Sequence, residues 1–138
     1  MLFLDTSALL KRYIDEADTP LVLESMDADR DWYASALAYA EAEVNLCRLG
    51  LVGTAGEPIH RRLADDWERF RVVPVDAACL FRAAEIGCTR GVRTAHAIHL
   101  AAADRLPRPL AFLTFDRRQA VAARALGVDV MGAAPGSG

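Results

Sequence analysis

Short apolar runs alternate with longer amphipathic segments along almost the whole chain. The runs are too short to form helices by themselves, so we predict that they are buried strands. They span residues 2–4, 31–35, 71–75, 110–116 and 128–132. Helical spacing or helix-favouring residues occupy the segments between them, at residues 8–14, 19–28, 36–51, 57–70, 77–90, 94–106 and 117–127. Strands that alternate with helices are typical of an α/β fold with a largely parallel sheet.

Several helix boundaries are marked by residues with a known positional preference. Pro20 falls in the first turn of its segment, where the missing N–H group costs nothing. Ser35 is suited to cap the helix predicted after it, because its hydroxyl can accept a hydrogen bond from a free backbone N–H group. We expect Gly53 and Gly56 to break the chain before the next helix begins at Glu57.

Two of the predicted strands lead into an aspartate. Asp5 follows the run of residues 2–4, and Asp116 closes the run of residues 110–116. The carboxyl ends of parallel strands share one edge of a sheet, which is where open α/β folds bind ligands. An aspartate in this position also caps the following helix, so both roles remain open. Carboxylates that gather at close range repel one another, and a divalent cation is the natural compensation.

A third carboxylate is available on the helix predicted over residues 36–51. Glu41 shares a helical face with Leu37 and Val44, whereas Glu43 points to nearly the opposite side. Both faces carry apolar residues, so periodicity leaves the choice between the two glutamates open.

Size, composition and charge narrow the functional classes. The 138 residues fit one domain, expected over residues 1–131 with a flexible tail at 132–138. No apolar stretch approaches the roughly 20 residues that a membrane span needs. The three cysteines lack a CxxC spacing, so a reducing, cytoplasmic setting is expected. A net charge of −3 argues against a protein that coats nucleic acid nonspecifically, yet it permits an enzyme with an acidic, metal-holding centre.

Four segments resemble a known family in their order and spacing. They read FLDTSALLKRY, SALAYAEAEVNLCR, TAHAIHLAAA and FLTFDRRQAVAARALGVDV. They are similar to the motif regions of PIN-domain ribonucleases, above all the VapC-type toxins of bacterial type II toxin–antitoxin modules, from Leu2 to about Val130. The resemblance implies a three-layer α/β/α PIN-like domain with a mostly parallel central sheet of four to five strands. By position it also implies that Asp5, Glu41 and Asp116 are catalytic residues that hold Mg²⁺ or Mn²⁺.

The same resemblance implies a function and partners. The chain is expected to be a divalent-metal-dependent endoribonuclease that cleaves single-stranded or structured RNA with a metal-activated water, as the toxin of a toxin–antitoxin pair. Its partners would be the RNA and a VapB-type antitoxin, in a homodimer or a toxin–antitoxin hetero-oligomer, without a membrane. Thr6 and Thr114 are candidates to bind water or oxygen around the metal, and Arg117 to contact the RNA. Their alternatives are a helix cap, a strand-end hydroxyl and a solvated arginine.

One position departs from the family pattern. The family commonly reads LDAIHLA where this chain reads AHAIHLA, so His96 replaces a fourth acidic residue, while His99 belongs to the ordinary motif. His96 can be a metal ligand that favours Mn²⁺, or a spectator beside three sufficient carboxylates. It can also mark a weakened or inactive nuclease, a PIN-fold module that binds RNA or protein without cutting. The nuclease hypothesis requires the side chains of residues 5, 41 and 116 to converge.

Overall fold

Five parallel strands form the centre of the protein in a computed structural model, which describes residues 1–133. The sheet order is β3-β2-β1-β4-β5, with β1 in the middle, so the predicted parallel α/β sheet is confirmed. The strands are β1 (Leu2–Leu4), β2 (Trp32–Ser35), β3 (Arg71–Val73), β4 (Ala111–Thr114) and β5 (Asp129–Gly132).

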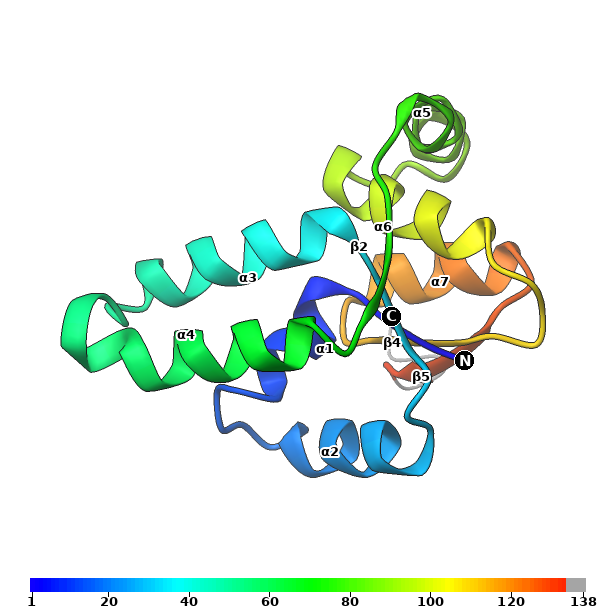
Figure 1. Cartoon of the computed structure of the whole chain (residues 1–138). Coiled ribbons are helices and arrows are strands. Elements are labelled where there is room, and N and C mark those ends of the chain that lie inside the picture. Colours follow the sequence, from blue (N-terminus) through cyan, green and yellow to red (C-terminus); the bar gives the residue numbers. More distant parts are fainter. Residues whose placement is uncertain (134–138) are drawn as a thin grey trace.

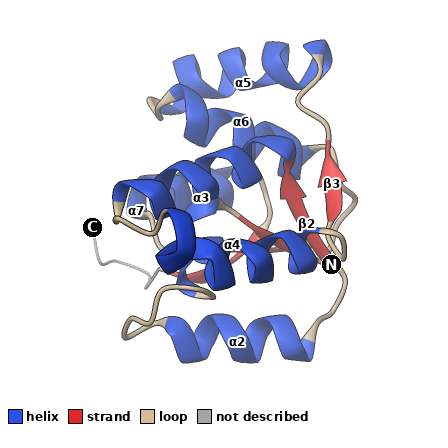
Figure 2. Ribbon diagram, turned by 60° about the vertical axis from the view of Figure 1, so that its left-hand side comes forward, coloured by secondary structure: helices blue, strands red, loops and turns tan. Residues whose placement is uncertain are grey.

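Helices cover both faces of the sheet and complete the three layers (Figures 1 and 2). The described residues contain α1 (Thr6–Lys11), α2 (Thr19–Ala28), α3 (Ala36–Arg48), α4 (Gly53–Trp67), α5 (Ala77–Arg90), α6 (Thr94–Asp104) and α7 (Arg117–Ala125). Helices α1 to α4 pack on one face, and α5 to α7 pack on the other. Figure 1 shows α3 and α4 as a pair that extends away from the sheet, with α2 and α5 on opposite sides of the molecule.

The two central strands are apolar on both faces, because helices bury each face. Along β1, Leu2 and Leu4 point toward α1 to α4, whereas Phe3 points toward α5 to α7. Phe3 stacks on Phe112 of β4, with ring centroids 5.3 Å apart, while Leu113 packs on the opposite side. A strand that is buried on both faces reads as a continuous hydrophobic run, which is why these runs were recognisable in the sequence.

The expected break at Gly53 and Gly56 is wrong, because α4 begins at Gly53 and runs through both glycines. Gly53 has a φ of +58°, so it forms the turn into the helix rather than a gap before it. At Gly56, a Cβ atom would lie 2.2 Å from the carbonyl oxygen of Leu51. This glycine therefore allows α4 to pack closely against the preceding loop.

Three expectations from the sequence concern the C-terminal tail, membrane spans and the cysteines. Gly132, the first residue of the expected tail, is the last residue of β5, and residues 134–138 lie outside the described residues. Within residues 1–133, no helix combines the length and the apolar character of a membrane span. Cys47, Cys79 and Cys88 are all free thiols.

A partly buried ion pair fastens α4 to α1. Asp66 accepts hydrogen bonds from Arg12 Nε at 2.9 Å and from the Tyr13 hydroxyl at 2.7 Å. Burial by itself favours the neutral carboxyl, but the bonds from Arg12 and Tyr13 outweigh it and hold the pKa of Asp66 below its usual value. The pair therefore stabilises the fold whenever Asp66 is ionised.

We expect Asp66→Asn to lower the free energy of unfolding by about 2 kcal/mol at pH 7, because hydrogen bonds to a charged group are lost. Asp66 titrates at lower pH in the folded than in the unfolded protein, whose carboxyl has a pKa of about 3.9. The difference between parent and variant is therefore complete above that pH and disappears as the pH falls through the lower folded-state pKa. Urea unfolding from pH 7 to pH 2 measures both effects.

The matched control is Asp65→Asn, which changes an exposed carboxylate on the same helix. It should leave the free energy of unfolding within about 0.5 kcal/mol of the parent value. Equal losses in the two variants, or a loss in Asp66→Asn that persists at acid pH, would contradict the role of the ion pair.

Candidate active site

Asp5 lies directly after β1 and caps the helix that follows. Its Oδ1 accepts hydrogen bonds from the Ala8 backbone N–H at 3.0 Å and from the Ser7 hydroxyl at 2.7 Å. Its Oδ2 faces the neighbouring strand β4 and accepts a hydrogen bond from the Thr114 hydroxyl at 2.5 Å. The two roles that the sequence left open for Asp5 are thus compatible, since one oxygen caps α1 and the other faces β4.

Thr114 connects the two aspartates that follow adjacent strands. While its hydroxyl donates to Asp5, its Oγ1 also accepts a hydrogen bond from the Asp116 backbone N–H at 3.1 Å. Asp116 in turn caps α7 through its Oδ1, which accepts from the Gln119 N–H at 2.8 Å. Ser7 adds a second link, because its Oγ accepts the Phe115 N–H at 3.0 Å. The ends of β1 and β4 are therefore fastened together by side-chain hydroxyls.

The two aspartates differ in their access to solvent. Asp5 is only 2% exposed, and its burial raises the pKa of the carboxyl, against the opposing effect of the bonds from Thr114, Ser7 and Ala8. Asp116 is more open, with 35% of its side chain exposed. A ligand at this edge of the sheet would thus meet Asp116 at the surface and Asp5 beneath it.

Glu41 reaches the same edge of the sheet from α3. Its Oε1 accepts hydrogen bonds from the Thr6 hydroxyl at 2.7 Å and from His99 Nε2 at 2.6 Å. The bond from His99 is the main cause that holds the pKa of Glu41 below its usual value, and the Thr6 bond adds to it against the opposing effect of burial. Because Thr6 follows Asp5 directly, Glu41 is tied to the residue next to the buried aspartate.

Glu43 points away from this edge and toward α4. Its carboxylate pairs with His60 Nδ1, while His60 Nε2 lies 2.7 Å from the Leu51 carbonyl oxygen. Both nitrogens of His60 thus face acceptors, and the bond to Leu51 is the main cause of its raised pKa. The choice that periodicity left open is decided by packing: Glu41 faces α1 and α6, whereas Glu43 joins α3 to α4.

His99, which the sequence analysis placed in the ordinary motif, has a role in the site that sequence reasoning did not assign. It is 2% exposed, its Nδ1 lies 2.9 Å from the Ser35 hydroxyl, and its Nε2 contacts both Glu41 and Thr6. The carboxylate requires a hydrogen on Nε2, so Ser35 donates to Nδ1 in the neutral ring. Ser35 occupies the N-cap position of α3 but makes no capping bond, so its expected capping role is wrong. The available signal was a polar residue within the apolar stretch AIHLAAA.

His96 lies beside Asp116, with its Nε2 atom 3.9 Å from Asp116 Oδ2 and 31% of its side chain exposed. That separation is too long for a hydrogen bond. Both residues line a cavity of about 520 Å³, together with Phe115, Arg93, Arg117 and Arg118. His96 therefore opens to the same space as Asp116.

The donor atoms at this edge suit a hard divalent cation. Within residues 1–133, Glu41 Oε2 and Asp116 Oδ2 accept no hydrogen bond, and Asp5 Oδ2 accepts only one. Carboxylate oxygens are the ligands that Mg²⁺ and Mn²⁺ prefer. Yet in the same part of the chain no group of three or more His, Cys, Asp or Glu side chains is close enough together to hold a metal ion. Asp5 and Asp116 are linked, and Glu41 is held nearby, without a closed cluster.

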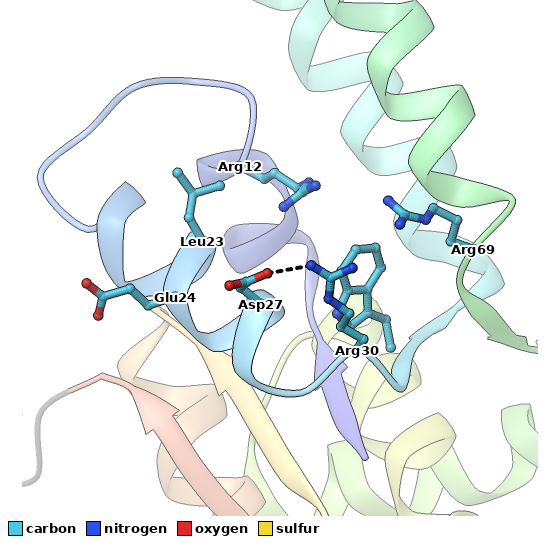
Figure 3. Close-up of a pocket in the computed structure, with 7 residues that line it drawn as sticks. Arg12, Leu23, Glu24, Asp27, Arg30 and Arg69 are labelled. Carbon is cyan, nitrogen blue, oxygen red and sulfur yellow. Dashed lines mark hydrogen bonds and ion pairs between the residues drawn. The ribbon is translucent and has the colours of Figure 1, made fainter.

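A different pocket lies at the opposite, amino-terminal ends of the strands (Figure 3). It measures about 440 Å³, and most of its charges already have partners. Asp27 pairs with Arg30 at 2.7 Å, and the guanidinium groups of Arg12 and Arg69 each lie 5.3 Å from the ring centre of Trp32. The contacts with Trp32 join the end of α1 and the loop before β3 to β2, so we assign them to the packing of the fold.

Comparisons with known proteins agree with the architecture. The model of the PIN domain family matches residues 2–125. Similar solved structures include FitAB bound to an IR36 DNA fragment, with a TM-score of 0.69, 23% identity, and 95% of this chain and 94% of that chain covered. VapBC2 from Rickettsia felis, bound to a promoter DNA fragment, has a TM-score of 0.67, 14% identity and coverage of 95% and 99%. VapBC-5 from Mycobacterium tuberculosis has a TM-score of 0.59, 20% identity and coverage of 94% and 95%. No curated protein matches the chain at a significant level.

Replacing His99 with Phe is expected to raise the pKa of the Glu41 carboxyl, because the bond that favours its ionised form is lost. Thr6→Val should shift that pKa in the same direction with less disturbance of the core. A carbon-detected NMR titration of the side-chain carboxyls measures the effect. The control is His60→Phe, which removes the partner of Glu43. Because Glu43 lies on the same helix as Glu41 but faces the other way, this change should leave the pKa of Glu41 unaltered. An unaltered Glu41 pKa in both variants would contradict the role given to His99.

Proposed function

The chain belongs to the PIN-domain family, and we propose that it is a divalent-metal-dependent endoribonuclease that acts as the toxin of a VapBC-type toxin–antitoxin pair. The observation that carries the proposal is the link from Asp5 through Thr114 to Asp116 at the carboxyl ends of β1 and β4. Glu41, held by Thr6, supplies the third carboxylate. Two aspartates and a glutamate at one sheet edge are a donor set for Mg²⁺ or Mn²⁺.

The state of Asp5 supports a cation at this edge. Its carboxylate is buried, and the basic residues nearest to it in the sequence are committed elsewhere. Lys11 pairs with Glu16 at 2.5 Å, and Arg12 pairs with Asp66. Burial of a carboxylate that has hydrogen-bond donors but no cationic partner remains costly, so a bound divalent cation would relieve the cost that the fold incurs at Asp5.

The proposed chemistry divides between the ion and the side chains. When bound, a divalent cation neutralises charge on the phosphodiester and lowers the pKa of a water that it holds. Ser7 and Thr114 fix the orientation of Asp5, and His99 and Thr6 hold the Glu41 carboxylate in place and favour its ionised form. Asp116, which is more exposed, is the carboxylate that an incoming phosphate meets first.

The pairing with an antitoxin rests on the similar structures. One of them is described as a toxin–antitoxin complex and another as a member of the VapBC family of toxin–antitoxin systems, and three are described as bound to DNA. By analogy, we expect this chain to form a homodimer or a hetero-oligomer with an antitoxin in the cytoplasm, where its RNA substrate is found. A small gene directly upstream of the coding sequence would be the first candidate for that partner.

A second candidate function is a PIN domain that binds RNA with weakened or absent cleavage. The observation that favours it is His96, which stands where the family commonly has a fourth acid and lies 3.9 Å from Asp116. A neutral imidazole contributes no negative charge, so the site would attract Mg²⁺ less strongly than four carboxylates would.

Replacing Asp5 or Asp116 with Asn, or Glu41 with Gln, is expected to lower metal-dependent cleavage of a mixed single-stranded RNA pool by about a hundredfold or more, since each change removes a charged ligand. Chelation by EDTA should abolish cleavage by the parent protein. Glu43→Gln is the matched control on α3 and should cleave at the parent rate. Circular dichroism checks that each variant is folded. Parent-like cleavage by a folded Asp5, Glu41 or Asp116 variant would exclude that residue as a ligand.

Replacing His96 with Asp tests the two candidate functions against each other. If His96 weakens a nuclease site, the variant should cleave RNA at least about tenfold faster in Mg²⁺, with a smaller gain in Mn²⁺, because a hard carboxylate replaces an imidazole. Initial rates in each metal give the ratio. An unchanged metal preference would place His96 outside the ligands, and absence of cleavage from both proteins would favour the binding module.

A further inference from the structure

Two adjoining cavities on the Asp116 side of the site are lined by arginines. The cavity of about 520 Å³ that holds His96 and Asp116 is also lined by Arg93, Arg117 and Arg118. A second cavity, of about 460 Å³, is lined by Arg90, Arg117 and Arg118 together with apolar residues of α7. Since two arginines line both cavities, the spaces adjoin and form one basic track that leads from Asp116 to the end of α5.

The four arginines of the track, Arg90, Arg93, Arg117 and Arg118, are exposed and available to an anion. Within residues 1–133, none of them forms an ion pair with an aspartate or a glutamate. Three arginines on the same side of the sheet are paired instead: Arg82 and Arg108 share Asp104, and Arg105 binds Asp76. The track thus concentrates positive charge beside the site in a protein whose net charge is −3.

The position of Arg117 and Arg118 works against the stability of their own helix. They are the first two residues of α7, where the helix dipole is positive and disfavours cations. An anion in the adjoining cavities would offset that cost. Arginine suits phosphate oxygens in particular, because its planar fork of N–H groups can bind two of them at once.

The track also carries surfaces that suit nucleobases. The half-buried ring of Phe115 lines the cavity at Asp116, and the exposed Val121 lines the cavity at Arg90. Basic grooves with aromatic side chains on which bases stack are typical of proteins that bind single-stranded nucleic acid. A compact inorganic anion would use the arginines but not these platforms.

We propose that this track holds one arm of the RNA substrate. The strand runs from the cleavage position at Asp116 over the start of α7 to the end of α5, with Arg93, Arg117, Arg118 and Arg90 binding its phosphates. Phe115 stacks against a base next to the cleavage position. This inference rests on the proposed nuclease function and identifies the side of the site that binds the RNA strand.

The test measures RNA binding in the absence of cleavage. A fluorescein-labelled single-stranded RNA of 12 nucleotides is titrated with the protein in EDTA, at several salt concentrations. Arg117→Gln/Arg118→Gln should weaken binding by about tenfold or more and reduce the slope of log K against log salt by about 1.4, since each lost phosphate contact removes about 0.7. Phe115→Ala should weaken binding by about fivefold without a change in slope, because stacking releases no counterions.

The charge-matched control is Arg61→Gln/Arg124→Gln, which removes two exposed arginines, one on α4 and one in the last turn of α7. Its RNA affinity should remain within about twofold of the parent value and its salt slope within about 0.3, as expected for arginines away from the strand. Unchanged binding and slope in the Arg117/Arg118 variant, with cleavage by the parent intact, would overturn the track but not the nuclease. The track would also be overturned if the Arg117/Arg118 variant kept its RNA affinity and lost only its binding to an acidic protein partner. If the parent cleaves no RNA in Mg²⁺ or Mn²⁺, the nuclease proposal itself fails.

Discussion

The carboxylate buried at the end of β1 is the interaction on which the rest of the site depends. Asp5 tolerates burial because donors from two segments converge on it, Ser7 and Ala8 from α1 and Thr114 from β4. These donors meet only while β1 and β4 keep their register, in which Leu4 pairs with Leu113. A slip of one residue would reverse the faces of the strand and leave the carboxylate without partners. The requirements of the apolar core and of the polar site thus fix the same alignment.

The polar network then extends from the sheet into the helices. Thr6 and His99 bring Glu41 of α3 to the edge where Asp5 lies, and Ser35 at the end of β2 orients the imidazole. Each link joins segments that are far apart in the sequence, so the carboxylates can be positioned only after the layers have packed. Hydroxyl groups suit this purpose because they donate to a carboxylate and accept a second bond at once, as Thr114 does.

The sequence was informative where one physical rule acted alone. Short apolar runs predicted the parallel sheet, because strands that helices cover on both faces are apolar throughout. Asp5 and Asp116 were recognisable because both stand at the ends of such runs. It failed where two contacts competed for one residue. Periodicity could not choose between Glu41 and Glu43, because α3 packs against α1 on one side and α4 on the other. Ser35 satisfied the rule for a cap, but the buried His99 takes its hydroxyl, which only the folded arrangement reveals.

The distribution of charge explains how an acidic protein can recognise a polyanion. Net charge describes long-range attraction, whereas binding depends on the groups within a few ångströms of the ligand. At the amino ends of the strands, Arg12 and Arg30 are neutralised by aspartates. At the carboxyl ends, the acidic centre is flanked on the Asp116 side by arginines without such partners, whereas the pocket beside Glu41 is lined by one basic residue, Arg48. An RNA strand that crosses the acidic centre would therefore be bound mainly on the Asp116 side. The part of the strand on the Glu41 side makes fewer charged contacts and is free to differ among substrates.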